Sequence, residues 1–140
     1  MYENKEPLKK QNKFANGNNT GAKTLLIIDD EEAVLKVNTK ILRQLGYAVY
    51  ATSSGPAAVE IYKKQQVEIA AVLSDLQMPE MNGLDVHKEL VKINPSVKFI
   101  ILSSSFINGD VVKALGIKAF ISKPYTIDEI GNTIRRVLDS

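Results

Sequence analysis

The stretch TLLIIDDEEAVLKVNTKILRQLG, residues 24–46, joins a predicted strand directly to a predicted helix. Its first part, TLLIID (24–29), is a continuous apolar run that ends in an acid, which is typical of a parallel strand covered on both faces. From Glu31 onward, apolar residues recur at helical spacing and Gly46 is placed to end the helix. The residues on the predicted buried face of this helix are Val34, Val37, Ile41, Leu42 and Leu45.

The same alternation of strand and helix continues to the end of the chain. Further strands are predicted at residues 47–52, 69–75, 97–103 and 118–122. Helices are predicted at 54–65, 84–93, within 108–115 and at 126–139. Strands that alternate with helices favour right-handed crossovers and a parallel sheet. The sequence therefore predicts an α/β fold, a doubly wound five-stranded parallel sheet with helices on both faces.

Composition limits the class of protein. The chain has 140 residues, 44% of them hydrophobic and 24% charged, which suits one globular domain. It has no cysteine, so disulfides, thiolate metal sites and cysteine catalysis are excluded, and a reducing compartment is favoured. No apolar run approaches the roughly 18 residues that a membrane-spanning helix needs. We therefore predict a cytoplasmic protein without membrane contact in this segment.

The first 23 residues differ from the rest in composition. They hold five of the lysines and few large apolar residues, so they are predicted to be a flexible tail or interdomain linker before a domain at 24–140. The net charge of +2 comes from this segment. Its lysines lack the clustered arginines and interleaved aromatic residues of nucleic-acid sites, so no nucleic-acid partner is predicted.

Polar residues stand where the predicted strands end. Asp29 and Asp30 follow the first strand, Asp75 ends the third, Ser103 the fourth, and Lys123 follows the fifth. The carboxyl ends of parallel strands meet at one edge of the sheet, where such folds bind ligands. Three carboxylates close together repel one another unless a cation compensates them. A hard ion with few protein oxygens and several waters fits best, which indicates Mg²⁺.

Other chemistries lack their parts. The only histidine, His87, lies within the predicted helix at 84–93 and is predicted to be a surface residue, so a Ser-His-Asp triad is improbable. Neither a Walker loop nor a G-x-G-x-x-G stretch follows the first strand, which disfavours nucleotide binding. The set that remains is a carboxylate nucleophile, a metal, a lysine and a hydroxyl, and it fits phosphoryl transfer to an aspartate.

A purely structural interpretation stays open for each motif alone. Acids after a strand often favour the start of the next helix, which alone could explain Asp29 and Asp30. Serine runs and Lys-Pro pairs are common in loops. Their joint placement on successive strand ends is what favours a functional site.

Four segments resemble the receiver domains of two-component response regulators: LLIIDDEE (25–32), LSDLQMPEMNGLD (73–85), FIILSSS (99–105) and AFISKPY (119–125). They occur in the family's order and at similar spacing, and their wording is similar to that of C-terminal receivers of hybrid sensor histidine kinases. The resemblance implies a flavodoxin-like sheet with strand order 2-1-3-4-5.

The resemblance also implies a metal and phosphorylation site. Asp75 would be the phosphoacceptor and a Mg²⁺ ligand. Asp30 would bind Mg²⁺ directly, Asp29 through water, and Gln77 through its backbone carbonyl.

A second group of residues would bind and sense the phosphoryl group. By resemblance, Ser103 and Lys123 would hold its oxygens. Ser103 and Phe120 would switch conformation on phosphorylation, and Pro124 would form a cis peptide with Lys123.

The implied partners are proteins. The donor would be a phosphohistidine on a histidine kinase or phosphotransfer domain, and a downstream protein would contact the face formed by the fourth helix, fifth strand and fifth helix. The role would be signalling rather than enzymatic. The segment at 103–120 is about two residues shorter than usual, so a short fourth helix is expected.

Two alternatives are a receiver-like interaction module that is not phosphorylated and a Mg²⁺-dependent aspartyl phosphatase. The second is disfavoured because Asp29 and Asp30 are adjacent rather than two residues apart.

Overall fold

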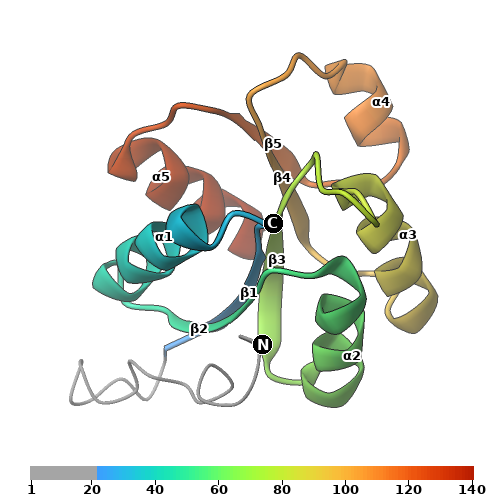
Figure 1. Ribbon diagram of the computed structural model, residues 1–140, viewed down its shortest axis with the longest axis horizontal. Coiled ribbons are helices and arrows are strands. Elements are labelled where there is room, and N and C mark those ends of the chain that lie inside the picture. Colours follow the sequence, from blue (N-terminus) through green and yellow to red (C-terminus); the bar gives the residue numbers. More distant parts are fainter. Residues whose placement is uncertain (1–21) are drawn as a thin grey trace.

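The computed structural model describes residues 22–140, and its centre is a parallel sheet. Its strands are β1 (Thr24–Ile28), β2 (Ala48–Thr52), β3 (Ile69–Asp75), β4 (Phe99–Ser103) and β5 (Ala119–Ser122). They lie in the order β2-β1-β3-β4-β5, and every neighbouring pair is parallel, which confirms the predicted sheet (Figure 1). Most of the predicted tail, up to residue 21, lies outside the described residues.

Helices cover both faces of the sheet. They are α1 (Glu32–Gln44), α2 (Gly55–Gln65), α3 (Gly83–Ile93), α4 (Gly109–Ala114) and α5 (Ile127–Leu138). Helices α1 and α5 lie on one face, and α2, α3 and α4 on the other (Figure 1). Along β1, Leu25 and Ile27 pack toward the first pair, and Leu26 and Ile28 toward the other group. Strand β1 is buried along its whole length and is apolar after Thr24, because both of its faces are covered.

Helix α4 is short, as expected from the shortened segment before Phe120. It has six residues and contributes one buried side chain, Val112, to the core. Val111 within the helix and Leu115 directly after it are exposed. Helix α4 itself therefore carries little buried apolar surface.

The predicted buried face of α1 is wrong in part. Of its five residues only Leu42 is buried, and Val37 is 57% exposed. The helix instead rests on the sheet through Leu35, Asn38, Thr39 and Leu42. Two of these are polar, so the apolar pattern indicated a neighbouring stripe of the helix rather than the one that packs. The apolar stripe faces the segment after β5, as described below.

The prediction for His87 is also wrong, because this residue is buried rather than at the surface. Its side chain is 5% exposed, and its ring meets Phe99 of β4 edge-on, with ring centroids 5.0 Å apart. His87 directly follows buried Val86 and precedes buried Leu90 by three residues, on the side of α3 that faces the sheet. The imidazole serves here as a mostly apolar ring, and burial lowers its pKa.

The buried imidazole predicts a decline of stability in weak acid. In the unfolded chain His87 takes up a proton near its ordinary pKa of about 6.5, whereas the folded chain resists protonation. Its contribution is therefore complete above about pH 6.5, falls as the pH decreases below that value, and stops falling below the lowered pKa of the folded state. His87→Phe should remove this part of the pH dependence.

The measurement is urea unfolding followed by circular dichroism between pH 5 and 7.5. Both proteins lose stability as carboxylates titrate, so the informative quantity is the wild-type minus His87→Phe difference in unfolding free energy. This difference should decrease on acidification. A difference that is constant across the range would contradict the prediction.

Candidate functional site

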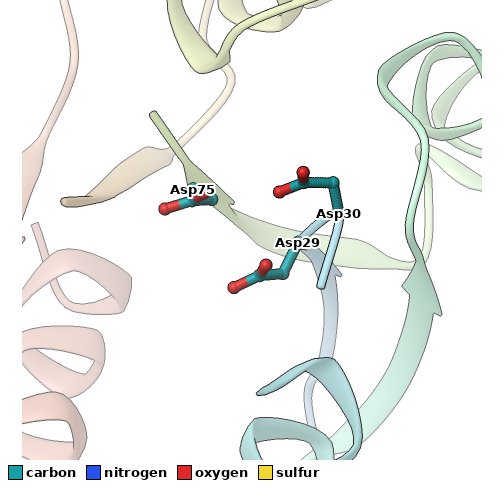
Figure 2. Close-up of side chains that lie close together, drawn as sticks. All are labelled: Asp29, Asp30 and Asp75. Carbon is teal, nitrogen blue, oxygen red and sulfur yellow. The ribbon is translucent and has the colours of Figure 1, made fainter. Parts of the chain in front are cut away.

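Three carboxylates gather at the carboxyl edge of the sheet. The register of β1 and β3 pairs Ile28 with Ser74, so the next residues, Asp29 and Asp75, stand side by side. Asp30 follows on the same turn. One oxygen of each carboxylate lies within 4.8 Å of the others (Figure 2). Asp29 is 1% exposed, and the other two are partly buried. The predicted acidic cluster is therefore present.

Lys123, which directly follows the edge strand β5, contacts two of these acids. Its Nζ donates to Asp75 Oδ1 at 2.9 Å and lies 3.7 Å from Asp29 Oδ2. The backbone N–H of Lys123 donates to the Ser103 carbonyl at 2.8 Å, which extends the β4–β5 pairing and fixes the lysine at the edge. Burial alone would lower the pKa of Lys123, but the hydrogen bond and charge of Asp75, with the charge of Asp29, raise it. The side chain is therefore an ammonium ion.

Asp29 is the most buried of the three acids, and Lys123 Nζ, 3.7 Å from its Oδ2, compensates its charge only from beyond hydrogen-bond distance. Burial raises its pKa, while the Glu31 backbone N–H, at 2.9 Å from Oδ1, and the charge of Lys123 oppose that rise. Its second oxygen, Oδ2, is buried without a hydrogen-bond partner. A buried carboxylate oxygen of this kind is costly unless a cation or donor meets it. Together with Asp30 and Asp75 it forms an all-oxygen set, which fits Mg²⁺.

The backbone around Asp75 is held tightly. The Asp75 carbonyl accepts from Ser74 Oγ at 2.9 Å, and the Leu76 carbonyl accepts from the Gly83 N–H at 2.8 Å. A Cβ at Gly83 would lie 2.7 Å from the Asp75 carbonyl oxygen, closer than real Cβ contacts come. Glycine is therefore required at this position by packing. The sequence indicated only a turn at Asn82-Gly83.

The predicted phosphoryl-binding hydroxyl of Ser103 is turned into its own loop. Ser103 is 2% exposed, and its Oγ accepts from the Ser105 N–H at 2.9 Å and donates to the Ser105 carbonyl at 3.2 Å. Ser105 Oγ in turn accepts from Gln77 Nε2 at 3.2 Å. Sequence reasoning missed these bonds, because they depend on how two loops meet.

The other two predicted switch residues are Phe120 and Pro124. Phe120 is partly buried in β5, opposite Ile101 of β4, and packs on the side of α2, α3 and α4. The peptide bond between Lys123 and Pro124 is cis. The switching roles of Ser103, Phe120 and Pro124, and the Gln77 carbonyl as a ligand, remain predictions.

An apolar hollow of about 500 Å³ adjoins the acidic cluster. The exposed stripe of α1 forms one wall of this hollow, and the segment after β5 forms the other. Lys123 belongs both to the hollow and to the acidic cluster. The main apolar lining residues are Val34, Val37, Ile41, Pro124 and Tyr125. Val34, Val37 and Ile41, which the sequence predicted to be buried, therefore line a surface beside the site.

Comparison with known proteins agrees with this arrangement. Residues 25–135 match the model of the response regulator receiver domain. The chain belongs to this family. As a receiver domain it is part of the two-component signalling systems, and the match covers every strand but the first residue of β1.

Two relatives are of different kinds. The receiver is 32% identical over 123 residues to sensor kinase CckA of Brucella abortus, covering 86% of this chain but 13% of CckA. It is 36% identical over 118 residues to chemotaxis protein CheY of Thermotoga maritima, covering 82% of this chain and 97% of CheY. The chain therefore matches a small part of one relative and nearly all of the other.

A solved structure is also similar. The CheX–CheY–BeF₃–Mg²⁺ complex from Borrelia burgdorferi contains a chain that is 27% identical, with a TM-score of 0.75, covering 82% of this receiver and 88% of that chain. Within residues 22–140 of the receiver, none of the helices has the length and apolar character needed to span a membrane.

Proposed function

We propose that this receiver takes a phosphoryl group from a phosphohistidine onto Asp75, with Mg²⁺, and signals by a conformational change. The observation that carries the proposal is the Lys123 ammonium between Asp75 and Asp29, beside Asp30. A lone acid at a strand end needs no such surroundings. A nucleophilic carboxylate that becomes an acyl phosphate needs nearby positive charge and a metal.

The chemistry follows from these positions. A carboxylate oxygen of Asp75 forms a bond to phosphorus, the P–N bond of the phosphohistidine breaks, and the leaving imidazole takes up a proton. Lys123 neutralises phosphoryl oxygens, and Ser103 can donate to one of them. Asp30, Asp75 and the Gln77 carbonyl would hold Mg²⁺ directly, and Asp29 through water. When bound, Mg²⁺ supplies positive charge at the transferring group.

The donor is a protein in this proposal, a histidine kinase or a histidine phosphotransfer domain. Such a donor must bring an imidazole to Asp75 and rest on the rim of the site. The hollow between α1 and the segment after β5 is apolar, exposed and shares Lys123 with the site, so we assign the docking of the donor to it. The similarity to both a sensor kinase and CheY is compatible with a donor in the same chain or in another.

The phosphorylated state would be read by a downstream protein. Movement of Ser103 toward the phosphoryl group would make room for Phe120 to turn inward, which biases an existing equilibrium between two states. The face of α4, β5 and α5 would change, and it carries exposed Val111, Leu115 and Ile127. We assign signalling in the cytoplasm to this receiver, rather than turnover of a metabolite.

The test is phosphorylation of the full chain. Incubated with Mg²⁺ and a phosphorylated histidine phosphotransfer domain, or with acetyl phosphate, the protein should acquire one phosphoryl group, as measured by intact-mass spectrometry. The adduct should survive acid and be lost in alkali or hydroxylamine, as an acyl phosphate is. Absence of an adduct, or labelling that is equal without Mg²⁺, would reject the proposal.

A variant of the hollow separates docking from chemistry. Val37→Asp should slow transfer from the protein donor and leave labelling by acetyl phosphate unchanged, because Val37 is exposed, lines the hollow and is not part of the acidic cluster. Equal slowing with both donors would show that the substitution perturbs the site rather than docking.

A further inference from the structure

A single side-chain hydrogen bond joins the two loops that flank Asp75. Gln77 lies in the loop after β3, and its Nε2 donates to Ser105 Oγ in the loop after β4, at 3.2 Å. The backbone of Ser105 in turn binds the Ser103 hydroxyl on both sides, at 2.9 and 3.2 Å. The three residues form a continuous chain from the loop after β3 to the hydroxyl at the end of β4.

This chain holds the Ser103 hydroxyl in a particular direction. The hydroxyl both accepts from and donates to the backbone of Ser105, so its single proton is used within the loop. Ser103 is buried, and Ser105 is partly buried. To donate to a phosphoryl oxygen on Asp75, the Ser103 hydroxyl must give up its donation to the Ser105 carbonyl, and the bond from Gln77 helps to hold Ser105 where it accepts that donation.

We propose that the Gln77 side chain is a positioning residue that acts through Ser105 and holds Ser103 in its unphosphorylated orientation. This inference rests on the proposed phosphorylation of Asp75. It gives Gln77 two separable parts: its backbone carbonyl is the predicted metal ligand, and its side-chain amide opposes the switch. The bond must open before the loop after β4 can follow the phosphoryl group.

The loop that this bond restrains leads to α4 within a few residues. Phe106 is 90% exposed, Ile107 packs against the core, and α4 begins at Gly109. A connection this short passes a movement of Ser105 on to α4. The Gln77 side chain thereby sets how readily the phosphoryl group changes the α4 surface.

The size of the effect follows from a single hydrogen bond. The net contribution of such a bond is modest and this one is partly exposed, so its loss should favour the switched state by about two- to fivefold. A ligand that binds the switched state gains the same factor, because its apparent affinity scales with the population of the competent state.

The experiment uses beryllofluoride with Mg²⁺ as a non-covalent phosphoryl mimic, titrated by NMR or calorimetry against the full chain. No phosphoryl group is transferred or hydrolysed, so the rates of transfer and hydrolysis do not enter the readout. Gln77→Met and Ser105→Ala should each bind beryllofluoride about two- to fivefold more tightly than the wild type. The double variant should match either single variant, because both remove the same bond. Ser105→Thr, which keeps the hydroxyl, should restore wild-type affinity.

Controls separate this inference from a structural effect and from the proposed function. Gln44→Met, at the exposed last residue of α1, should leave the affinity unchanged. Mg²⁺ affinity without beryllofluoride should be equal in Gln77→Met and wild type, since the carbonyl is retained. Unchanged or weaker beryllofluoride binding in both single variants, or additive effects in the double variant, would overturn the inference. Failure of the wild type to bind beryllofluoride would instead reject the proposed function.

Discussion

Asp75→Asn should reduce phosphorylation of the receiver to background with both acetyl phosphate and a phosphohistidine donor. The amide oxygen is a poor nucleophile and cannot form a stable acyl phosphate, whereas its shape is nearly that of the carboxylate. The neighbouring acids are poor replacements, because Asp29 is buried and turned toward Glu31 and Lys123. Intact-mass spectrometry after incubation with Mg²⁺ is the measurement.

The loss should come from chemistry and not from unfolding. The amide oxygen of the substituted side chain can still accept from Lys123 Nζ, now 2.9 Å from Asp75 Oδ1. Removing one negative charge also relieves repulsion among three carboxylates. The thermal midpoint without Mg²⁺ should therefore not decrease. Asp110→Asn, an exposed acid in the first turn of α4, is the matched control and should label like wild type. An Asp75→Asn protein that labels normally would sink the assignment of the phosphoacceptor.

The sheet and the acidic edge could be predicted because they rest on local patterns. Strand β1 is apolar on both faces and is followed at once by Asp29 and Asp30, so the strand, its parallel environment and its polar end are all visible in seven letters. Parallel strands bring such ends to one edge without further information. The presence of Lys123 beside Asp75 followed from the same rule.

Features that depend on how elements meet could not be predicted in this way. The stripe of α1 that packs contains Asn38 and Thr39, while Val37 faces solvent beside Pro124, so the apolar pattern there reports a second surface as well as the core. The exposure of His87 was predicted wrongly because imidazole is classed as a polar group, whereas here its ring packs against that of Phe99. These side chains take their roles from tertiary neighbours, which no spacing rule contains.

The same limit applies to the loops around Asp75. The need for glycine at position 83 arises from a 2.7 Å approach to the Asp75 carbonyl, and the bond between Gln77 and Ser105 joins residues 28 positions apart. Sequence patterns identify the turn and the serines, but the contact itself exists only once α3 and the loop after β4 are packed.

Lys123→Met should change the two activities of the site in opposite directions. The ammonium lies 2.9 Å from Asp75 and 3.7 Å from Asp29, so it already neutralises carboxylates that would bind Mg²⁺. Its removal leaves the acids more dependent on the metal. Because nearby charges interact by about 1–4 kcal/mol between water and a protein surface, Mg²⁺ affinity should rise by about tenfold.

Phosphoryl transfer should nevertheless become slower in Lys123→Met. The lysine is the side chain that would compensate charge on the phosphoryl oxygens during transfer, and loss of one such preorganised donor typically reduces rates by about 10²–10³. The reaction is quenched at successive times and the fraction phosphorylated is measured by intact-mass spectrometry. Saturating Mg²⁺ is used, so that tighter metal binding cannot mask a slower rate. Lys123→Arg keeps the charge and should retain more of the rate than Lys123→Met.

The opposite signs make the assignment of Lys123 testable without reference to fold stability. A lysine that served only to hold β5 at the edge would, on substitution, loosen the carboxylates and weaken Mg²⁺ binding together with transfer. A lysine that shares the carboxylates with Mg²⁺ and then serves the phosphoryl group gives tighter metal binding and slower transfer. Parallel loss of both quantities would therefore reject the proposed role of Lys123, even if Asp75 proves to be the acceptor.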